Sequence, residues 1–285
     1  MNLTLQYDAL KNEVETFLEL VHQALRQNPS AEPLYKGCVV MYSSLLEVPP
    51  FLFIGINPGD ELKESEQPKK DLDPGDGFEY TNAVTDVDYR LTKQTRGLFE
   101  MAGMGNLLEK SVKTNVYYIA TSNVKDLWQL FSLLGEDMNR RLHENAFKWT
   151  RRMIEMIKPK TIICEGIMPF SFTFEVRQNM HQSSNSLESR SHFCFDANPY
   201  PTGRRGLRRN RNGWRAAASD LSHFKLEFTP FNKLSEIYGV SKTRESVCGY
   251  FELPDKTPVI GYSRNRSNIQ NKCFVADFLR KKCNK

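Results

Sequence analysis

The stretch Phe51-Leu52-Phe53-Ile54-Gly55-Ile56-Asn57-Pro58-Gly59-Asp60 decides the fold class of this chain. An apolar run leads directly into Asn-Pro-Gly, a combination of turn-forming residues. The pattern predicts a buried strand that ends in a tight turn and carries one amide side chain, Asn57, at its tip. Because ligands of open α/β sheets bind just outside the carboxyl ends of the strands, this amide is a candidate ligand-binding group.

Similar apolar runs recur along the chain and alternate with segments of helical periodicity. We expect further strands near residues 116, 161 and 258, and helices over residues 3–28, 136–157 and 268–282. This alternation favours a mostly parallel sheet that is covered by helices on both faces. The predicted fold is α/β: a three-layer α/β/α domain with a central, mostly parallel four-stranded sheet. It spans residues 1–285, with a helical N-terminal part over 1–35 and an insertion over 181–255, before the last strand.

The composition is that of a globular protein with a modest positive charge. The chain has 285 residues, of which 40% are hydrophobic, and a net charge of +5. It contains no apolar run of about 18 residues, the length needed to span a membrane, and its N-terminus lacks the pattern of a secretory signal. Its six cysteines show no C-x-x-C spacing. We therefore expect a cytoplasmic monomer with no membrane contact, no bound metal and no cofactor.

Polar residues also follow the second predicted strand, which ends at Ser122 and Asn123. An amide at a strand tip offers a hydrogen-bond donor and an acceptor to a ligand. The alternative is that Asn123 caps the next helix, with Asp126 at the capping-box position. For Asn57 the alternative is a simple turn after a strand.

Two of these segments resemble motifs of the uracil-DNA glycosylase superfamily. Gly55-Ile56-Asn57-Pro58-Gly59 is similar to the Gly-x-Asn-Pro-Gly form of its mismatch-specific and single-strand-selective branches. Thr121-Ser122-Asn123-Val124-Lys125 resembles the Thr-Asn-Val-Val-Lys segment of the thermophile-type enzymes, with Ser122 inserted. The third predicted strand ends in Glu165-Gly166, where the family carries a Gly before its next helix.

The resemblance implies roles for particular residues. Asn57, with Asp60 as a second candidate, would direct water at the sugar carbon, and Asn123 would hydrogen-bond to the edge of the base. An aromatic side chain would stack on the flipped base, as such a base loses its stacking neighbours. Tyr80 is the first candidate for this platform and Phe78 the second, and the other expected base-binding residues are Ile56 and Ser263.

The last family motif, His-Pro-Ser or Asn-Pro-Ser, has no direct counterpart, and two segments compete for its place. Residues 262–268 follow a convincing apolar strand and precede the last helix, whereas Asn198-Pro199-Tyr200-Pro201 is closer by letter. We favour the first segment. Arg264 would then take the electrostatic role of the missing His and face the base as it leaves with negative charge.

A basic segment, residues 203–215, is suited to the phosphates of DNA because six guanidinium groups are interleaved with Leu207 and Trp214. The alternative is a solvated basic loop. The predicted DNA-binding residues are Arg204, Arg205, Leu207, Arg208, Arg209, Arg211, Arg266 and Asn198.

Together these features predict a monofunctional DNA glycosylase that hydrolyses an N-glycosidic bond and leaves an abasic site. Uracil is the base implied by the resemblance, and a modified pyrimidine such as hypermodified cytosine in phage DNA is an alternative. A second class is a non-catalytic DNA-binding protein on the same fold. A small-molecule α/β hydrolase is disfavoured because the sequence has no Gly-x-Ser-x-Gly elbow and no P-loop.

Overall fold

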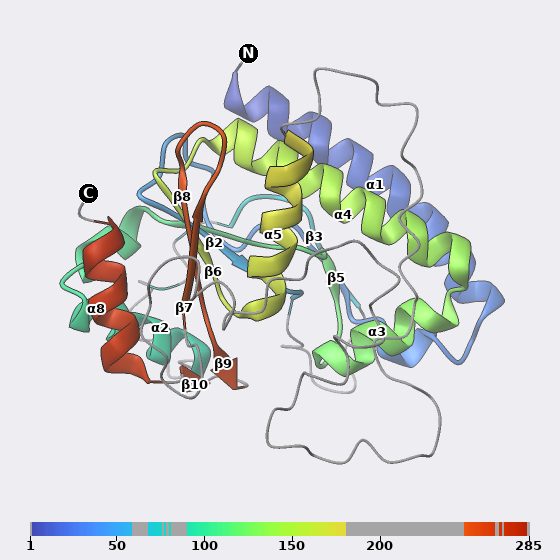
Figure 1. The fold of residues 1–285 in the computed structure, drawn as a ribbon. Coiled ribbons are helices and arrows are strands. Elements are labelled where there is room, and N and C mark those ends of the chain that lie inside the picture. Colours follow the sequence, from blue (N-terminus) through green and yellow to red (C-terminus); the bar gives the residue numbers. More distant parts are fainter. Residues whose placement is uncertain are drawn as a thin grey trace.

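The computed structural model describes residues 2–58, 68–75, 77, 80, 90–180, 248–265, 268–269 and 271–283. Its central element is a five-stranded sheet with the strand order β4-β2-β6-β8-β7 (Figure 1). The strands are β2 (Phe51–Gly55), β4 (Val112–Asn115), β6 (Thr161–Cys164), β7 (Cys248–Glu252) and β8 (Pro258–Tyr262). Four of them run parallel, and β7 pairs antiparallel with β8 at one edge.

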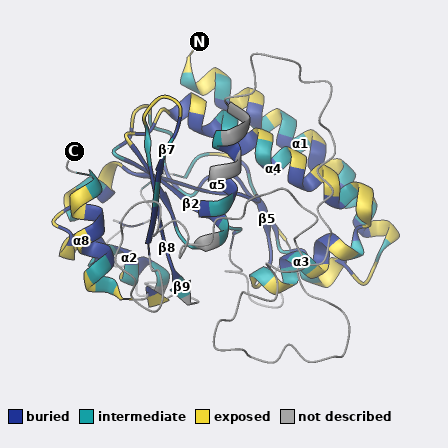
Figure 2. Ribbon diagram, viewed as in Figure 1, coloured by how far each residue is buried: buried dark blue, intermediate teal, exposed yellow. Residues whose placement is uncertain are grey.

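Helices cover both faces of this sheet, and each face has its own apolar core. One core contains Leu52, Ile54 and Ile162 of the sheet, and the other contains their alternating neighbours Phe51, Phe53 and Ile163. The first core is covered by α1 (Leu3–Gln27), α4 (Glu136–Ile157) and α5 (Ile167–Met180). The second is covered by α2 (Arg90–Met101), η2 (Gly105–Lys110) and α8 (Lys272–Cys283). Figure 2 shows the buried strands between helices whose outer sides are exposed.

The remaining elements are short. The three-stranded sheet β3-β1-β5 lies beside the main sheet, and its strands are β1 (Gly37–Val39), β3 (Lys69–Asp71) and β5 (Ile119–Ala120). The others are η1 (Glu32–Leu34), α3 (Val124–Leu133) and the strand pair β9 (Arg264–Asn265) and β10 (Asn268–Ile269).

The predicted α/β class with a parallel-rich sheet is confirmed, but the main sheet has five strands instead of four. The additional strand, β7, consists of the residues 248–252 that close the segment predicted as an insertion. Residues 253–255 lead from β7 towards β8, and residues 181–247 lie outside the described residues.

The predicted position of the second strand was wrong. The apolar run 116–121 is not part of the main sheet; the strand beside β2 is the more polar Val112-Lys113-Thr114-Asn115. All four of its residues are buried. The prediction assigned these apolar residues to a strand of the main sheet. In the structure, Tyr117 and Tyr118 pack among α1, α3 and α4 in the first core.

The polar strand β4 tolerates burial because a neighbouring segment, residues 40–43, satisfies its outer edge. The Tyr42 amide donates to the Lys113 carbonyl (3.1 Å), and the Lys113 amide donates to the Ser43 hydroxyl (2.9 Å). The Thr114 hydroxyl donates to the Val40 carbonyl (2.7 Å). Buried polar groups with such partners cost little free energy, whereas unpaired ones are expensive.

In the described part of the chain, no helix combines the length and the apolar character that a membrane crossing requires.

Helix α4 ends at a residue with a left-handed backbone. Lys158 has φ of 52° and ψ of 56°, its amide donates to the Ile154 carbonyl (2.9 Å), and Pro159 prevents the helix from continuing. This cap geometry favours glycine, which has no Cβ to collide with the backbone.

We therefore predict that Lys158→Gly raises the free energy of unfolding by about 0.5 to 1 kcal/mol, because relief of strain exceeds the added entropy of the unfolded chain. Urea denaturation measures the change. Lys160→Gly, at a position with ordinary φ, should lower stability instead. Equal effects of the two substitutions would contradict this account.

His143 of α4 is buried among aromatic rings. Its Nδ1 lies 2.6 Å from the Tyr117 hydroxyl, and its ring packs against Trp128 and Phe131. Burial lowers the pKa of His143 from 6.5 to about 4. The folded state therefore binds a proton less readily than the unfolded state does, and protonation favours unfolding.

The contribution of His143 to stability should be complete above pH 6.5 and should be lost as the pH falls towards 4, with a total loss of about 3 kcal/mol. In His143→Gln, which cannot titrate, the unfolding free energy should fall less steeply over this range. His22→Gln is the comparison: partial burial also lowers the pKa of His22, so this variant should flatten the profile too, but less than His143→Gln does. Identical pH profiles for wild type and His143→Gln would contradict the prediction.

Candidate functional site

The strand order places a candidate site at the carboxyl end of β2. The chain runs from β2 to β4 on one side and later to β6 on the other, so the sheet order reverses at β2. In open α/β sheets such a switch point leaves a crevice outside the strand ends, where ligands bind. The polar residues that follow β2, β4, β6 and β8 are therefore the first candidates for a functional site.

A row of residues crosses the sheet at this edge. Gly55 of β2 is in register with Asn115 of β4. On the other side of β2, Ile54 is in register with Cys164, and Cys164 with Gly261, so Glu165 and Tyr262 occupy the next position along. Because side chains alternate along strands, the row lies on the face covered by α2 and α8.

The centre of this row is the carboxylate of Glu165, whose side chain is only 3% exposed. Its Oε2 accepts a hydrogen bond from the Tyr80 hydroxyl (2.6 Å). Its Oε1 accepts from the hydroxyls of Thr95 (3.1 Å) and Tyr262 (3.3 Å). A carboxylate in this environment is costly to bury without such donors.

Arg264 forms an ion pair with this carboxylate. Its Nη2 lies 2.6 Å from Glu165 Oε1, and its side chain is 5% exposed. The same Nη2 also donates to the hydroxyls of Thr95 and Tyr262. Burial opposes ionisation of Glu165, but the charges of Arg264 and Lys113 and the donated hydrogen bonds outweigh it and hold the pKa of Glu165 below its ordinary value.

Lys113 of β4 brings a second cation to this region. The residue is 8% exposed, and its Nζ lies 5.1 Å from the ring centres of both Tyr42 and Tyr80. A cation over an aromatic face within about 6 Å is attracted by the ring quadrupole. The two rings therefore help to hold the Lys113 ammonium in its buried position.

At the tip of β2 the orientation of the Asn57 amide is fixed by its neighbours. Asn57 Nδ2 donates to the Pro58 carbonyl (2.9 Å) and to the Thr121 hydroxyl (3.0 Å). The carbonyl can only accept, and the hydroxyl already donates its proton to the Asn123 carbonyl (2.8 Å). Both contacts require a donor, so they assign the nitrogen, and the remaining group of this side chain is its oxygen, an acceptor.

The two predicted strand tips thus meet, but Asn123 has the role of a cap. Its Oδ1 accepts from the Asp126 amide (3.0 Å) and its Nδ2 donates to the Asp126 carboxylate (2.6 Å), at the start of α3. Asn123 is exposed. The capping alternative therefore describes its geometry, and its amide groups are already engaged.

A buried amide that the sequence prediction missed lies instead at the end of β4. Asn115 is 3% exposed, and its Nδ2 has no hydrogen-bond partner among the described residues. A Cβ built on Gly55 would lie 2.3 Å from Asn115 Oδ1, so this side chain occupies the space that glycine leaves open. The sequence contained one signal for this residue. If Val112-Lys113-Thr114-Asn115 is a strand, its side chains alternate between the two faces, and Lys113 and Asn115 share one face.

The structure also describes three other predicted base-binding residues, Tyr80, Ser263 and Ile56. The Tyr80 side chain is buried, and its ring lies 4.6 Å from that of Phe53, edge to face. Ser263 is buried directly after β8, and Ile56 is partly buried against the first core.

Several predicted residues lie outside the described part of the chain. They are Asp60, Phe78, Arg266, Asn198, Arg204, Arg205, Leu207, Arg208, Arg209 and Arg211.

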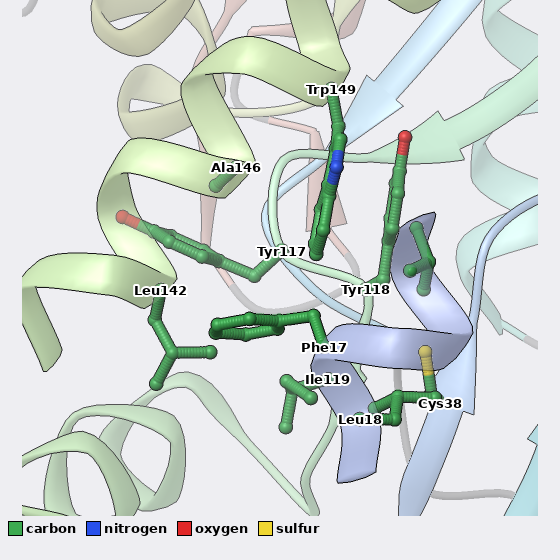
Figure 3. Close-up of a pocket in the computed structure, with 10 residues that line it drawn as sticks. Phe17, Leu18, Cys38, Tyr117, Tyr118, Ile119, Leu142, Ala146 and Trp149 are labelled. Carbon is green, nitrogen blue, oxygen red and sulfur yellow. The ribbon is translucent and has the colours of Figure 1, made fainter. Parts of the chain in front are cut away.

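A small cavity lies on the other side of the sheet (Figure 3), away from the polar row. It measures about 10 Å³ and is lined by apolar groups of α1, α4 and residues 117–119, including Phe17, Ala146 and Trp149. The volume is at most that of one water molecule, so it offers no room for a ligand.

Among the residues that the structure describes, no three His, Cys, Asp or Glu side chains are grouped so that they could hold a metal ion. The sequence matches no protein-family model, and no curated protein is significantly similar to it. The resemblance to the uracil-DNA glycosylases therefore rests on the short sequence motifs alone.

The buried ion pair gives a prediction about stability. Glu165→Gln leaves the Arg264 charge buried without its carboxylate and should cost about 3 kcal/mol of unfolding free energy at pH 7. Because the pKa of Glu165 is lowered in the folded state, this cost should shrink as the pH falls below the ordinary value of 4.5.

The double variant Glu165→Gln/Arg264→Met should recover part of the loss, since it removes both charges. Urea denaturation measures all three proteins. The matched control is Glu155→Gln, which breaks the exposed Arg151–Glu155 pair (2.7 Å) and should cost less than about 1 kcal/mol. A Glu165→Gln cost as small as that of the control would contradict a stabilising role of the pair.

Proposed function

We propose that this protein is a monofunctional DNA glycosylase related to the uracil-DNA glycosylase superfamily, which hydrolyses the N-glycosidic bond of uracil or a modified pyrimidine. In this proposal the parallel strands β4, β2, β6 and β8 are the central four-stranded sheet of a three-layer α/β/α domain, and β7 is an addition at its edge. The observation that carries the proposal is the pair of amides, Asn57 and Asn115, at neighbouring strand tips of the switch point.

Asn57 is suited to orient a water molecule. Its nitrogen is held by two acceptors, so its oxygen is presented as an acceptor in a fixed direction. A water that donates to this oxygen keeps a lone pair for attack at C1′ of the deoxyribose. Asp60 remains a second candidate because a carboxylate can act as a general base.

Asn115 is the better candidate for the base edge than Asn123. Its amide is buried, and a buried amide offers a donor and an acceptor that match the O4 and N3 groups of uracil. An unsatisfied buried donor is costly, so its pairing with a base would contribute to specificity. In this assignment the exposed Asn123 only positions α3 and the Thr121 hydroxyl.

Tyr80 is a poorer stacking platform than the sequence suggested, since its ring packs on Phe53 and its hydroxyl is bonded to Glu165. Phe78 then becomes the first candidate for the platform. The Arg-rich segment 203–215 remains the proposed contact to DNA phosphates, and the substrate base remains either uracil or a modified pyrimidine, including hypermodified cytosine of phage DNA.

A second candidate function, a non-catalytic DNA-binding protein on the same fold, is favoured by one contact. Arg264, the residue proposed to receive the charge of the leaving base, is in direct contact with Glu165, which offsets its positive charge. If no other cation faces the base, such a site would bind a base and not release it.

Base release from oligonucleotides tests the proposal. The substrates are single- and double-stranded DNA with uracil, 5-hydroxymethyluracil, hypoxanthine, and hydroxymethylated or glucosylated cytosine, and alkali cleaves the abasic product. We expect release of one base, and a loss of about 100-fold or more in kcat for Asn57→Ala. Asn115→Ala and Gly55→Ala, whose Cβ would displace the Asn115 oxygen, should lose activity and selectivity together.

Asn12→Ala, an exposed residue of α1, is the matched control and should behave as wild type. Full activity of Asn57→Ala would contradict its role with water. If wild type releases none of these bases but binds DNA in a salt-dependent manner, the non-catalytic alternative is favoured.

A further inference from the structure

The helices on the two sides of the main sheet carry very different charge. The layer formed by α1 and α4 contains seven basic and eight acidic residues. The opposite layer, formed by α2, η2 and α8, contains eight basic and only three acidic residues. Its excess of positive charge is as large as the net charge of the whole chain, +5. Positive charge is therefore concentrated on one side of the sheet.

The pairing of these charges differs as well. On α1 and α4, six of the seven basic side chains form ion pairs with carboxylates; they are Lys11, Arg140, Arg141, Lys148, Arg151 and Arg152. On the opposite layer, Lys93, Lys272 and Lys281 form no ion pair with any residue that the structure describes. Lysines without an acidic neighbour are available to an anionic partner.

Two of these lysines lie at the seam between α2 and α8, which run side by side (Figure 1). Gly97 of α2 opens this position, because a Cβ built on it would lie 2.6 Å from the Lys272 Nζ. Lys93 precedes Gly97 by four residues, so the two are neighbours on one face of α2. The exposed Lys93 and the partly buried Lys272 therefore bring two positive charges to adjacent places on the seam.

This arrangement is unfavourable for the protein alone. Like charges at neighbouring positions repel each other. Lys272 is also the first residue of α8, and a cation at a helix N-terminus opposes the helix dipole. An anion bound at the seam would offset both effects, since lysines and helix N-termini each favour negative charge.

The seam begins beside the candidate site. Thr95 lies between Lys93 and Gly97 on α2, and its hydroxyl is bonded to Glu165 at the end of β6. Lys281 is exposed in the last turn of α8, nine residues after Lys272 and about 14 Å away along the helix axis. This length corresponds to about four base pairs of a DNA duplex. The three lysines thus extend from the edge of the sheet that carries the polar row along the outside of the domain.

We propose that Lys93, Lys272 and Lys281 form a docking surface for the phosphate backbone of the DNA that flanks the target base. The inference deepens the proposed function and rests on DNA as its partner, but it does not depend on base release. Charge identifies the partner: DNA carries one negative charge per about 1.7 Å of duplex axis, and lysines spaced along a helix suit such a dense row of phosphates.

An anionic membrane fits this surface less well. Helices that bind in the membrane interface insert large apolar side chains between the lipids. On the described part of the α2, η2 and α8 layer, Met101 is the one large hydrophobic side chain that is exposed. The surface therefore has the charge that an anionic partner needs without the apolar anchors that a membrane needs.

Fluorescence anisotropy of a labelled duplex tests the surface, because it measures affinity and its dependence on salt. The triple variant Lys93→Gln/Lys272→Gln/Lys281→Gln should bind about tenfold or more weakly than wild type at about 0.1 M salt. The slope of log K against log salt should become shallower by about 2 to 3, since each lost phosphate contact removes about 0.9. All three side chains are at least partly exposed, so the variant should fold.

The matched control is Lys148→Gln/Lys158→Gln/Lys160→Gln, which removes the same charge from exposed positions in α4 and directly after it. Its affinity and its salt slope should stay close to those of wild type. Equal weakening in the two triple variants would reduce the effect to net charge and would overturn the docking surface.

Vesicles of phosphatidylserine and phosphatidylcholine supply the alternative partner. If the Lys93→Gln/Lys272→Gln/Lys281→Gln variant loses vesicle binding but keeps the DNA affinity of wild type, the surface serves a membrane and the proposal is wrong.

The failures of the two proposals are distinguishable. If wild type binds the duplex in a salt-dependent manner and the Lys93→Gln/Lys272→Gln/Lys281→Gln variant binds it equally well, the docking surface is overturned while a function on DNA still stands. If wild type shows neither salt-dependent binding nor base release, both proposals are overturned.

Discussion

The structure depends on one desolvated carboxylate, Glu165, at the end of β6. Removing this charge from water is expensive, and the cost is offset only because four residues from three parts of the chain supply donors or charge to it. Tyr80, Thr95 of α2, and Tyr262 and Arg264 at the end of β8 all converge there. The position of α2 on the sheet is thereby fixed by directional polar contacts as well as by the apolar packing of Phe53 and Phe99.

The polar groups at this edge of the sheet are of two kinds: those of the buried ion-pair network and the two amides at the strand tips. The ion pair and its hydroxyl partners are almost completely removed from solvent and hydrogen-bond to one another. The amides of Asn57 and Asn115 differ, because one presents an oriented acceptor and the other has a donor without a partner among the described residues. Polar groups with hydrogen-bonding capacity left over are those that a ligand can use.

The sequence predicted correctly those strands of the main sheet that consist of apolar residues. The strands at 51, 161 and 258 were located from their apolar runs, and α1 and α4 from helical periodicity. The prediction failed for β4, because burial of a polar strand depends on partners distant in sequence, such as Ser43 and Val40. For the same reason the sequence prediction did not include Asn115, the buried amide at the end of this strand. The pairing of Glu165 with Arg264 could not be foreseen, since 99 positions separate the two residues.

The segment over β4 has a consequence for how the molecule behaves in a crowded solution. An uncovered parallel edge strand offers a ladder of unpaired amides and carbonyls to any other extended chain, and it is a common starting point for aggregation. Here residues 40–43 already occupy that ladder through Tyr42, Ser43 and the bridge between Met41 and Thr114. On this side, residues 40–43 occupy the edge at which another extended chain could pair, so β4 is shielded from intermolecular pairing.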